Sequence, residues 1–225
     1  MRKLFLAFIA IIILFGLYAA NLYNFLLFHS IAEGFSIVIA CGIFMVAWNT
    51  RHYNPGNYLV FIGIAYLFIG ILDFSHTLSY EGMNIFVRFD ANAPTQLWIA
   101  TRYVESLTLL LAPFLSKRRI RIDVCFAAYG IITAAILLTV FYWQVFPDCF
   151  LADAGGLTPF KIISEYIICL LLLASGVLFV YERNHFDPRF LRLVLMSLAT
   201  TIAAELLFTT QLSGLDSRGK YKITY

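Results

Sequence analysis

The stretch LLFHSIAEGFSIVIACGIFMVAW, residues 26–48, is apolar and long enough to cross a bilayer, because about 20 apolar residues span the hydrocarbon core. It nevertheless contains His29 and Glu33, which lie one turn apart on the same face of a helix. An ionisable side chain at the bilayer centre costs at least about 2.5–3.5 kcal/mol. This stretch therefore predicts a membrane helix whose two ionisable side chains face the interior of a protein bundle rather than lipid.

The composition of the whole chain points to the same class of protein. Of its 225 residues, 61% are hydrophobic and only 13% are charged, and the mean hydropathy is +0.84. Soluble domains are about half apolar, and a transmembrane β-barrel would show alternating segments of about 10 residues instead of continuous apolar runs. We therefore predict an all-α fold, a polytopic transmembrane helical bundle of about seven spans. The candidate spans are residues 4–20, 26–48, 58–78, 98–115, 124–143, 162–180 and 193–210.

Lysine and arginine predict the orientation of the spans, because they gather in cytoplasmic loops. The positively charged segments are the first residues and the loops TRHYNPGN, SKRRIRID and YERNHFDPR, so we expect a cytoplasmic N-terminus. The first run follows Arg2 and Lys3 as in a signal peptide, but it lacks a convincing cleavage site, and we interpret it as a retained helix. We assign residues 1–210 to the membrane domain and 211–225 to a polar basic tail. Seven spans would put this tail outside, so either the last span is misjudged or an eighth helix is missing.

Several function classes find no support in the sequence. The four cysteines form neither a CxxC pair nor a zinc-finger spacing. No phosphate-binding loop, dinucleotide fingerprint or nucleophile motif occurs, so this chain is not expected to be an enzyme. The net charge is +3, and the basic residues lie largely in short loops between spans, so we predict no nucleic-acid partner.

Ionisable residues from five of the spans fall at a similar predicted depth, in the outer half of the bilayer. Three pairs among them are spaced three or four residues apart, so each pair shares one helix face. Five carboxylates against one arginine would be untenable in a low dielectric without protonation, water or a bound cation. We therefore predict a polar cavity open to the outside that holds shared protons, a cation or a small polar ligand. This polar layer consists of His29, Glu33, Asp73, His76, Arg102, Glu105, Glu165 and Glu205.

Structural roles and a metal site remain open alternatives for members of the polar layer. Arg102 and Glu105 could neutralise each other as an ion pair, and Glu165 could be an acid at a helix N-terminus. His29, Glu33 and His76 have the ligand types that zinc and iron prefer, although no HExxH motif accompanies them. A haem held between the two histidines is disfavoured, and the cofactor is left unknown.

Three segments in order resemble a known family. LFHSIAEGFSIVIACGIFMVAWNT, LDFSHTLSYEGMNIF and TQLWIATRYVESLTLLLAPFL are similar to the bacterial membrane-associated sensor domain family, third type (MASE), over about residues 20–208. The resemblance implies a multi-helix input module of the bacterial cytoplasmic membrane, of the kind that precedes histidine kinase or diguanylate cyclase domains. Such relatives continue into a further helix and an output domain, of which no motif is present in this sequence. The matching positions are His29, Glu33, His76, Tyr80, Gly82, Met83, Arg102, Glu105, Glu165 and Glu205.

These observations favour a sensory input domain that binds an unknown ligand or ion in its polar layer. A small proton- or ion-coupled transporter and a metal- or haem-binding membrane protein remain alternatives. Sensor modules often act as dimers or through a separate signalling partner, and the small residues Gly63, Ala65 and Gly70 could allow close helix contact between copies.

Overall fold

The computed structural model describes residues 2–52, 58–116, 120–151 and 156–216 of the chain, and the described part is almost entirely helical. Its helices correspond one to one to the predicted spans, which confirms the all-α fold. They are α1 (Arg2–Tyr23), α2 (Phe25–Thr50), α3 (Tyr58–Ser79), α4 (Asn92–Leu115), α5 (Ile122–Leu137), α6 (Pro159–Tyr181) and α7 (Pro188–Asp216).

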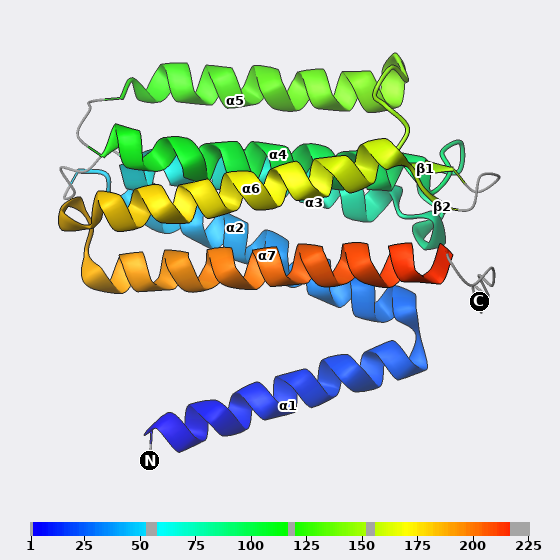
Figure 1. Ribbon diagram of the computed structural model, residues 1–225, viewed down its shortest axis with the longest axis horizontal. Helices are drawn as coiled ribbons and strands as arrows, with labels where there is room; N and C mark the ends of the chain where they lie inside the picture. The colour runs from blue at the N-terminus through cyan, green and yellow to red at the C-terminus, as the bar shows by residue number, and fades with distance from the viewer. Residues whose placement is uncertain (1, 53–57, 117–119, 152–155, 217–225) are drawn as a thin grey trace.

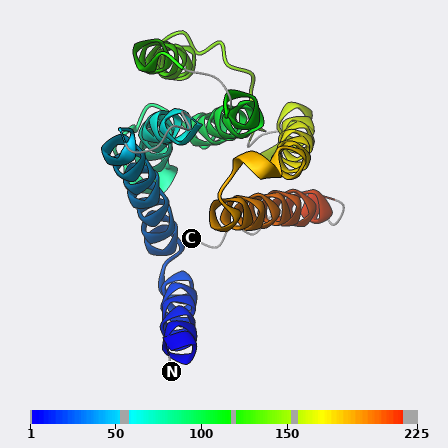
Figure 2. The same ribbon diagram turned by 90° about the vertical axis from the view of Figure 1, so that its left-hand side faces the viewer.

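The helices lie side by side along the long axis of the molecule (Figure 1). Contacts run in the order α1, α2, α3, α4, α6 and α7, and α5 packs on α3. Viewed along the bundle, this chain of contacts forms an arc with α3 and α4 near its centre (Figure 2). The residues for the polar layer therefore come from consecutive members of the arc.

Large apolar side chains cover the outward faces of the helices, as a lipid environment requires. Phe15, Val38, Ile131 and Leu170 are each about two-thirds exposed or more. By length and composition, α2, α3, α5 with the turn that follows it, α6 and the Pro188–Leu207 part of α7 could cross a membrane. The chain is thus a multi-pass membrane protein.

Three helices begin at least three residues earlier than predicted, each close to a proline. α4 starts at Asn92 and contains Pro94 in its first turn, α6 starts at Pro159, and α7 starts at Pro188. Proline is tolerated in the first turn of a helix because the amide hydrogen it lacks would have no partner there. α7 also extends to Asp216, into the segment that we assigned to the tail, and residues 217–225 lie outside the described residues.

A two-stranded antiparallel hairpin marks one end of the bundle, here called the hairpin end. Its strands are β1 (Phe150–Leu151) and β2 (Gly156–Leu157). Asn92 attaches the hairpin to α4, because its side-chain oxygen accepts hydrogen bonds from the amides of Cys149 at 2.8 Å and Phe150 at 3.0 Å. Its amide nitrogen donates to Asp148 at 2.7 Å. This side chain therefore fixes the segment before α6 against the start of α4.

Small residues bring α2 and α3 close together within one chain. A Cβ atom added at Gly63 would collide with Ala47, and one added at Gly70 would lie 3.4 Å from Ala40. Ala65 is fully buried in the core. Gly63 and Gly70 therefore serve the α2–α3 packing and Ala65 is buried within the chain, so the predicted homodimer loses this support.

Candidate functional site

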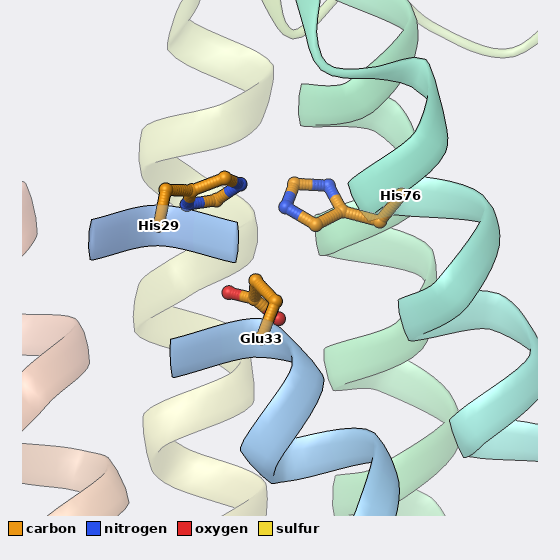
Figure 3. A group of neighbouring side chains, drawn as sticks. All are labelled: His29, Glu33 and His76. Atoms are coloured by element: carbon orange, nitrogen blue, oxygen red, sulfur yellow. The ribbon is translucent and has the colours of Figure 1, made fainter. Parts of the chain in front are cut away.

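Three ionisable side chains meet between α2 and α3, near the hairpin end. α2 presents His29 and Glu33 on one face, as their spacing predicts, and α3 presents His76 towards them (Figure 3). One ligand atom from each residue lies within 4.8 Å of the others, and the two imidazole rings are 5.6 Å apart between centroids. We call these three residues the His–Glu cluster.

The ring of His76 is oriented by the backbone of α4. Its Nδ1 lies 2.8 Å from the carbonyl oxygen of Pro94. A carbonyl oxygen only accepts hydrogen bonds, so Nδ1 carries the proton, and in the neutral ring Nε2 offers a lone pair. The Nε2 atoms of His76 and His29 are both buried, and neither has a hydrogen-bond partner among the described residues. Buried polar atoms without a partner are rare, which makes the cluster a candidate site for another group.

An arginine-centred group lies next to the His–Glu cluster. The Arg102 guanidinium contacts Asp73 at 3.2 Å and Glu105 at 2.5 Å, so it bridges α3 and α4. Tyr66 donates to the other oxygen of Glu105 at 3.0 Å, and Arg102 stacks over the Trp98 ring with its central carbon 4.7 Å from the centroid. The predicted Arg102–Glu105 pair is therefore present, but it forms part of a larger network.

The acidic residues of α6 and α7 continue the polar layer across the bundle. Glu165 is 1% exposed and forms a hydrogen-bonded ion pair with Lys161, which is equally buried. Glu205 is also buried, within range of electrostatic interaction with Arg102, Glu165 and Lys161. The span that the sequence predicts to start at residue 162 leaves Lys161 in an outer loop. This expectation was wrong, since α6 begins at Pro159 and buries Lys161 one turn before Glu165.

The charge and depth of the polar layer differ from the prediction in two respects. Lys161 is a second buried cation, so five carboxylates face two positive side chains rather than one. Arg102 lies about 15 Å from the start of α4, at 1.5 Å per residue, because the helix starts earlier than expected. Arg102 and Glu105 therefore occupy the middle of their helix, whereas His29, Glu33 and His76 lie nearer the hairpin end.

Two further residues from the predicted site lie in the segment after α3 and contact α2 near the hairpin end. The Tyr80 ring lies 4.3 Å from that of His29 between centroids. Burial, reinforced by the neighbouring Glu81 carboxylate, raises the pKa of the Tyr80 hydroxyl. The Met83 sulfur accepts a hydrogen bond from the Ser30 hydroxyl at 3.8 Å. These contacts connect the segment after α3 to α2.

Sequence reasoning missed three polar contributors: Tyr66, Trp98 and Lys161. Tyr66 and Trp98 stand in apolar runs and resemble ordinary core or interface aromatics. The signal for Lys161 was available, because Thr158 followed by Pro159 is a typical helix start. The Thr158 hydroxyl accepts from the Lys161 amide at 3.3 Å as a helix cap.

Two surface hollows lie beside the His–Glu cluster. One is lined by Tyr80, Glu81 and residues 84 and 86–90, and the other by residues of the α1–α2 junction together with Met83. Neither includes His29, Glu33 or His76 in its lining. The ligand atoms of the cluster itself lie within 4.8 Å of one another, a spacing suited to a bound ion or a water molecule.

Comparison with known proteins places the chain in a family. The family model described as membrane-associated sensor domain, MASE3, matches residues 20–217, which is most of the chain. The chain belongs to the MASE3 family. No curated protein and no solved structure matches this MASE3 chain. The family match confirms the resemblance seen in the sequence, and it covers every helix that contributes to the polar layer.

Proposed function

We propose that this MASE3 chain is a sensory input module of the bacterial cytoplasmic membrane, and that its stimulus binds in the polar layer from the outer side. The single observation that carries the proposal is one layer of buried and half-buried ionisable residues from five helices. Burying that many ionisable groups is unfavourable unless they form ion pairs or bind an ion or a polar ligand. In this proposal the hairpin end faces outwards and the positively charged loops face the cytoplasm.

A bound stimulus would act by favouring one packing of the helices over another. Only a ligand with different affinities for two states can shift their equilibrium. Residues of the polar layer contact one another across α2, α3 and α4, so a change at one member alters the contacts between helices. An output domain, either a kinase or a cyclase, would read this change at the cytoplasmic ends and would be supplied outside the described chain.

The apolar character of the opposite half favours a sensor over a transporter. A transport path must be lined by polar groups through both halves of the membrane. The described end of α3 away from the hairpin packs Tyr58 against Phe186 and Phe190, and Gly63 against Ala47. A site that is closed on one side suits detection of a ligand.

A chimera tests the proposed function. The chain is joined, through one added transmembrane helix, to a cytoplasmic diguanylate cyclase domain, and cyclic dinucleotide is measured in cells. We expect Glu33→Gln and Arg102→Gln to change the output several-fold, because both perturb the polar layer. Glu81→Gln, an exposed acid at the same end, is the matched control. Equal output from all three variants and the parent, at equal membrane levels, would refute the proposed sensory role.

A further inference from the structure

We propose that His29, Glu33 and His76 bind one divalent first-row transition-metal ion, of the zinc(II) or iron(II) class. This inference deepens the proposed function by naming the class of ligand. Two imidazoles and one carboxylate are the protein ligands of several catalytic zinc sites and of non-haem iron(II) sites, both of which leave positions open. The three side chains come from two helices and meet at one point (Figure 3).

The two histidine nitrogens of the cluster are oriented and placed so that they can bind a cation. The Pro94 carbonyl directs the lone pair of His76 Nε2 away from α4, as the outer-shell partner of a metal-bound histidine does. The buried Nε2 of His29 also lacks a hydrogen-bond partner among the described residues. Two such nitrogens beside a carboxylate are suited to a metal ion, because a cation accepts lone pairs that no nearby donor satisfies.

The neighbouring network leaves Glu33 as the carboxylate available to the ion. Asp73 is the nearest other acid, but its oxygen contacts Arg102 at 3.2 Å. Glu105 is held by Arg102 and by the Tyr66 hydroxyl. Glu33 makes no hydrogen bond to another described side chain, although it interacts electrostatically with Asp73 and Arg102. Arg102 therefore holds Asp73 and Glu105 in ion pairs, which leaves Glu33 as the acid that binds the cation.

The spacing of the ligands connects binding to helix movement. The ligand atoms lie up to 4.8 Å apart. Around a tetrahedral ion with bonds of about 2.0–2.1 Å, ligand atoms are separated by about 3.3 Å. Binding would therefore draw the hairpin end of α2 towards α3, whereas the Gly63–Ala47 contact holds the other end of the pair. The metal-bound and metal-free states would then differ in their α2–α3 contacts, and a sensor needs two states that the ligand binds with different affinity.

Metal titration of the full chain in lipid nanodiscs tests the site. The protein is stripped with a chelator and titrated with Zn²⁺ against a chromophoric indicator, with Fe²⁺ without oxygen, and with Co²⁺ as an optical probe. We expect one equivalent to bind. His29→Gln, Glu33→Gln and His76→Gln should each weaken binding by more than the about 10–100-fold that loss of an outer-shell partner causes.

Two matched controls and one measurement on the unmodified chain complete the test. His185→Gln and Glu81→Gln change exposed residues and should leave binding unchanged. Histidine-specific acylation mapped by mass spectrometry should show Zn²⁺ protecting His29 and His76 but not His52 and His185. This readout needs no variant to fold. Absence of stoichiometric binding, or binding without protection of these two histidines, would overturn the metal site.

The metal site and the proposed function fail in different ways. Binding of Zn²⁺ to the chain without any change in chimera output on metal removal would leave the site intact and refute metal sensing. A chimera that responds to Glu33→Gln while the chain binds no metal would support sensing of another stimulus and refute the metal site.

Discussion

The hairpin-end half of the bundle and the opposite half are stabilised by different interactions. Towards the hairpin end, Arg102 joins α3 to α4 through ion pairs, Lys161 and Glu165 pair within α6, and two imidazole nitrogens have no hydrogen-bond partner among the described residues. At the opposite end, Tyr58, Phe179, Phe186 and Phe190 pack with centroid distances of 4.9–6.3 Å. The aromatic cluster contains no group that binds a cation, whereas the proposed metal would change contacts between helices in the polar half.

The largest expected effect comes from removing the central cation of the polar half. Arg102→Met would leave Asp73 and Glu105 buried without their counterion, and breaking a buried pair in this way costs about 3–5 kcal/mol. The free energy of unfolding should fall by this amount when it is measured in mixed micelles with increasing SDS. Arg192→Met, at an exposed position, should stay within about 0.5 kcal/mol of the parent. Equal stability of the two variants would show that the Arg102 network contributes little.

An intermediate effect is expected from overpacking the apolar half. Gly63→Ala introduces a methyl group that collides with Ala47, and such overpacking typically costs about 1–3 kcal/mol. Gly42→Ala is the matched control on α2, because an added Cβ meets nothing within 4 Å there. The double change Gly63→Ala with Ala47→Gly should recover most of the lost stability in the same unfolding assay. Failure of this rescue would indicate that the two helices are not in close contact.

The smallest effect concerns the loop that closes the hairpin end, and it is measured as reactivity. Burial raises the pKa of the Cys149 thiol to about 12. Because the thiolate is the reactive form, labelling by a water-soluble maleimide should rise steadily with pH up to about pH 10 without reaching a plateau. Asn92→Ala removes the acceptor for the Cys149 amide and should speed the labelling, whereas Asn49→Ala should not. A plateau near pH 9 on the Cys149 peptide, followed by mass spectrometry, would contradict a closed loop.

Helical periodicity was sufficient to predict which side chains share a face. His29 with Glu33, and Asp73 with His76, lie on common faces because residues three or four apart are neighbours on any helix. The cost of burying charge in a membrane was sufficient to predict that these faces point inwards. Both arguments use only local geometry and solvation, so they apply before any contact between helices is known.

The boundaries of the helices were predicted less well, and the prolines explain why. The predicted spans start at residues 98 and 162 and so leave Pro94 and Pro159 in loops, although each stands in the first turn of a helix. The shift of three residues in α6 was enough to move Lys161 from a solvated loop into the buried layer. Thr158 and Pro159 together predict a helix start, so this error could have been avoided.

Contacts between helices could not be read from the sequence. Nothing local distinguishes Gly63, which meets Ala47, from Gly42, which meets nothing within 4 Å. Tyr66 looks like any aromatic residue of an apolar span until its hydroxyl is found at 3.0 Å from Glu105. Such pairings depend on the rotation of each helix about its axis, which is set by the packing of the whole bundle.

The hydrogen bond from His76 to Pro94 has a consequence for how this site can vary in evolution. The acceptor is a main-chain carbonyl, and every amino acid carries one, so substitution at position 94 does not remove the acceptor. What does matter is the length of the segment between Ser79 and Asn92, because an insertion there would turn a different carbonyl towards the imidazole. A substitution at position 94 therefore leaves the proton on Nδ1 of His76, whereas an insertion or deletion in this segment can change its position.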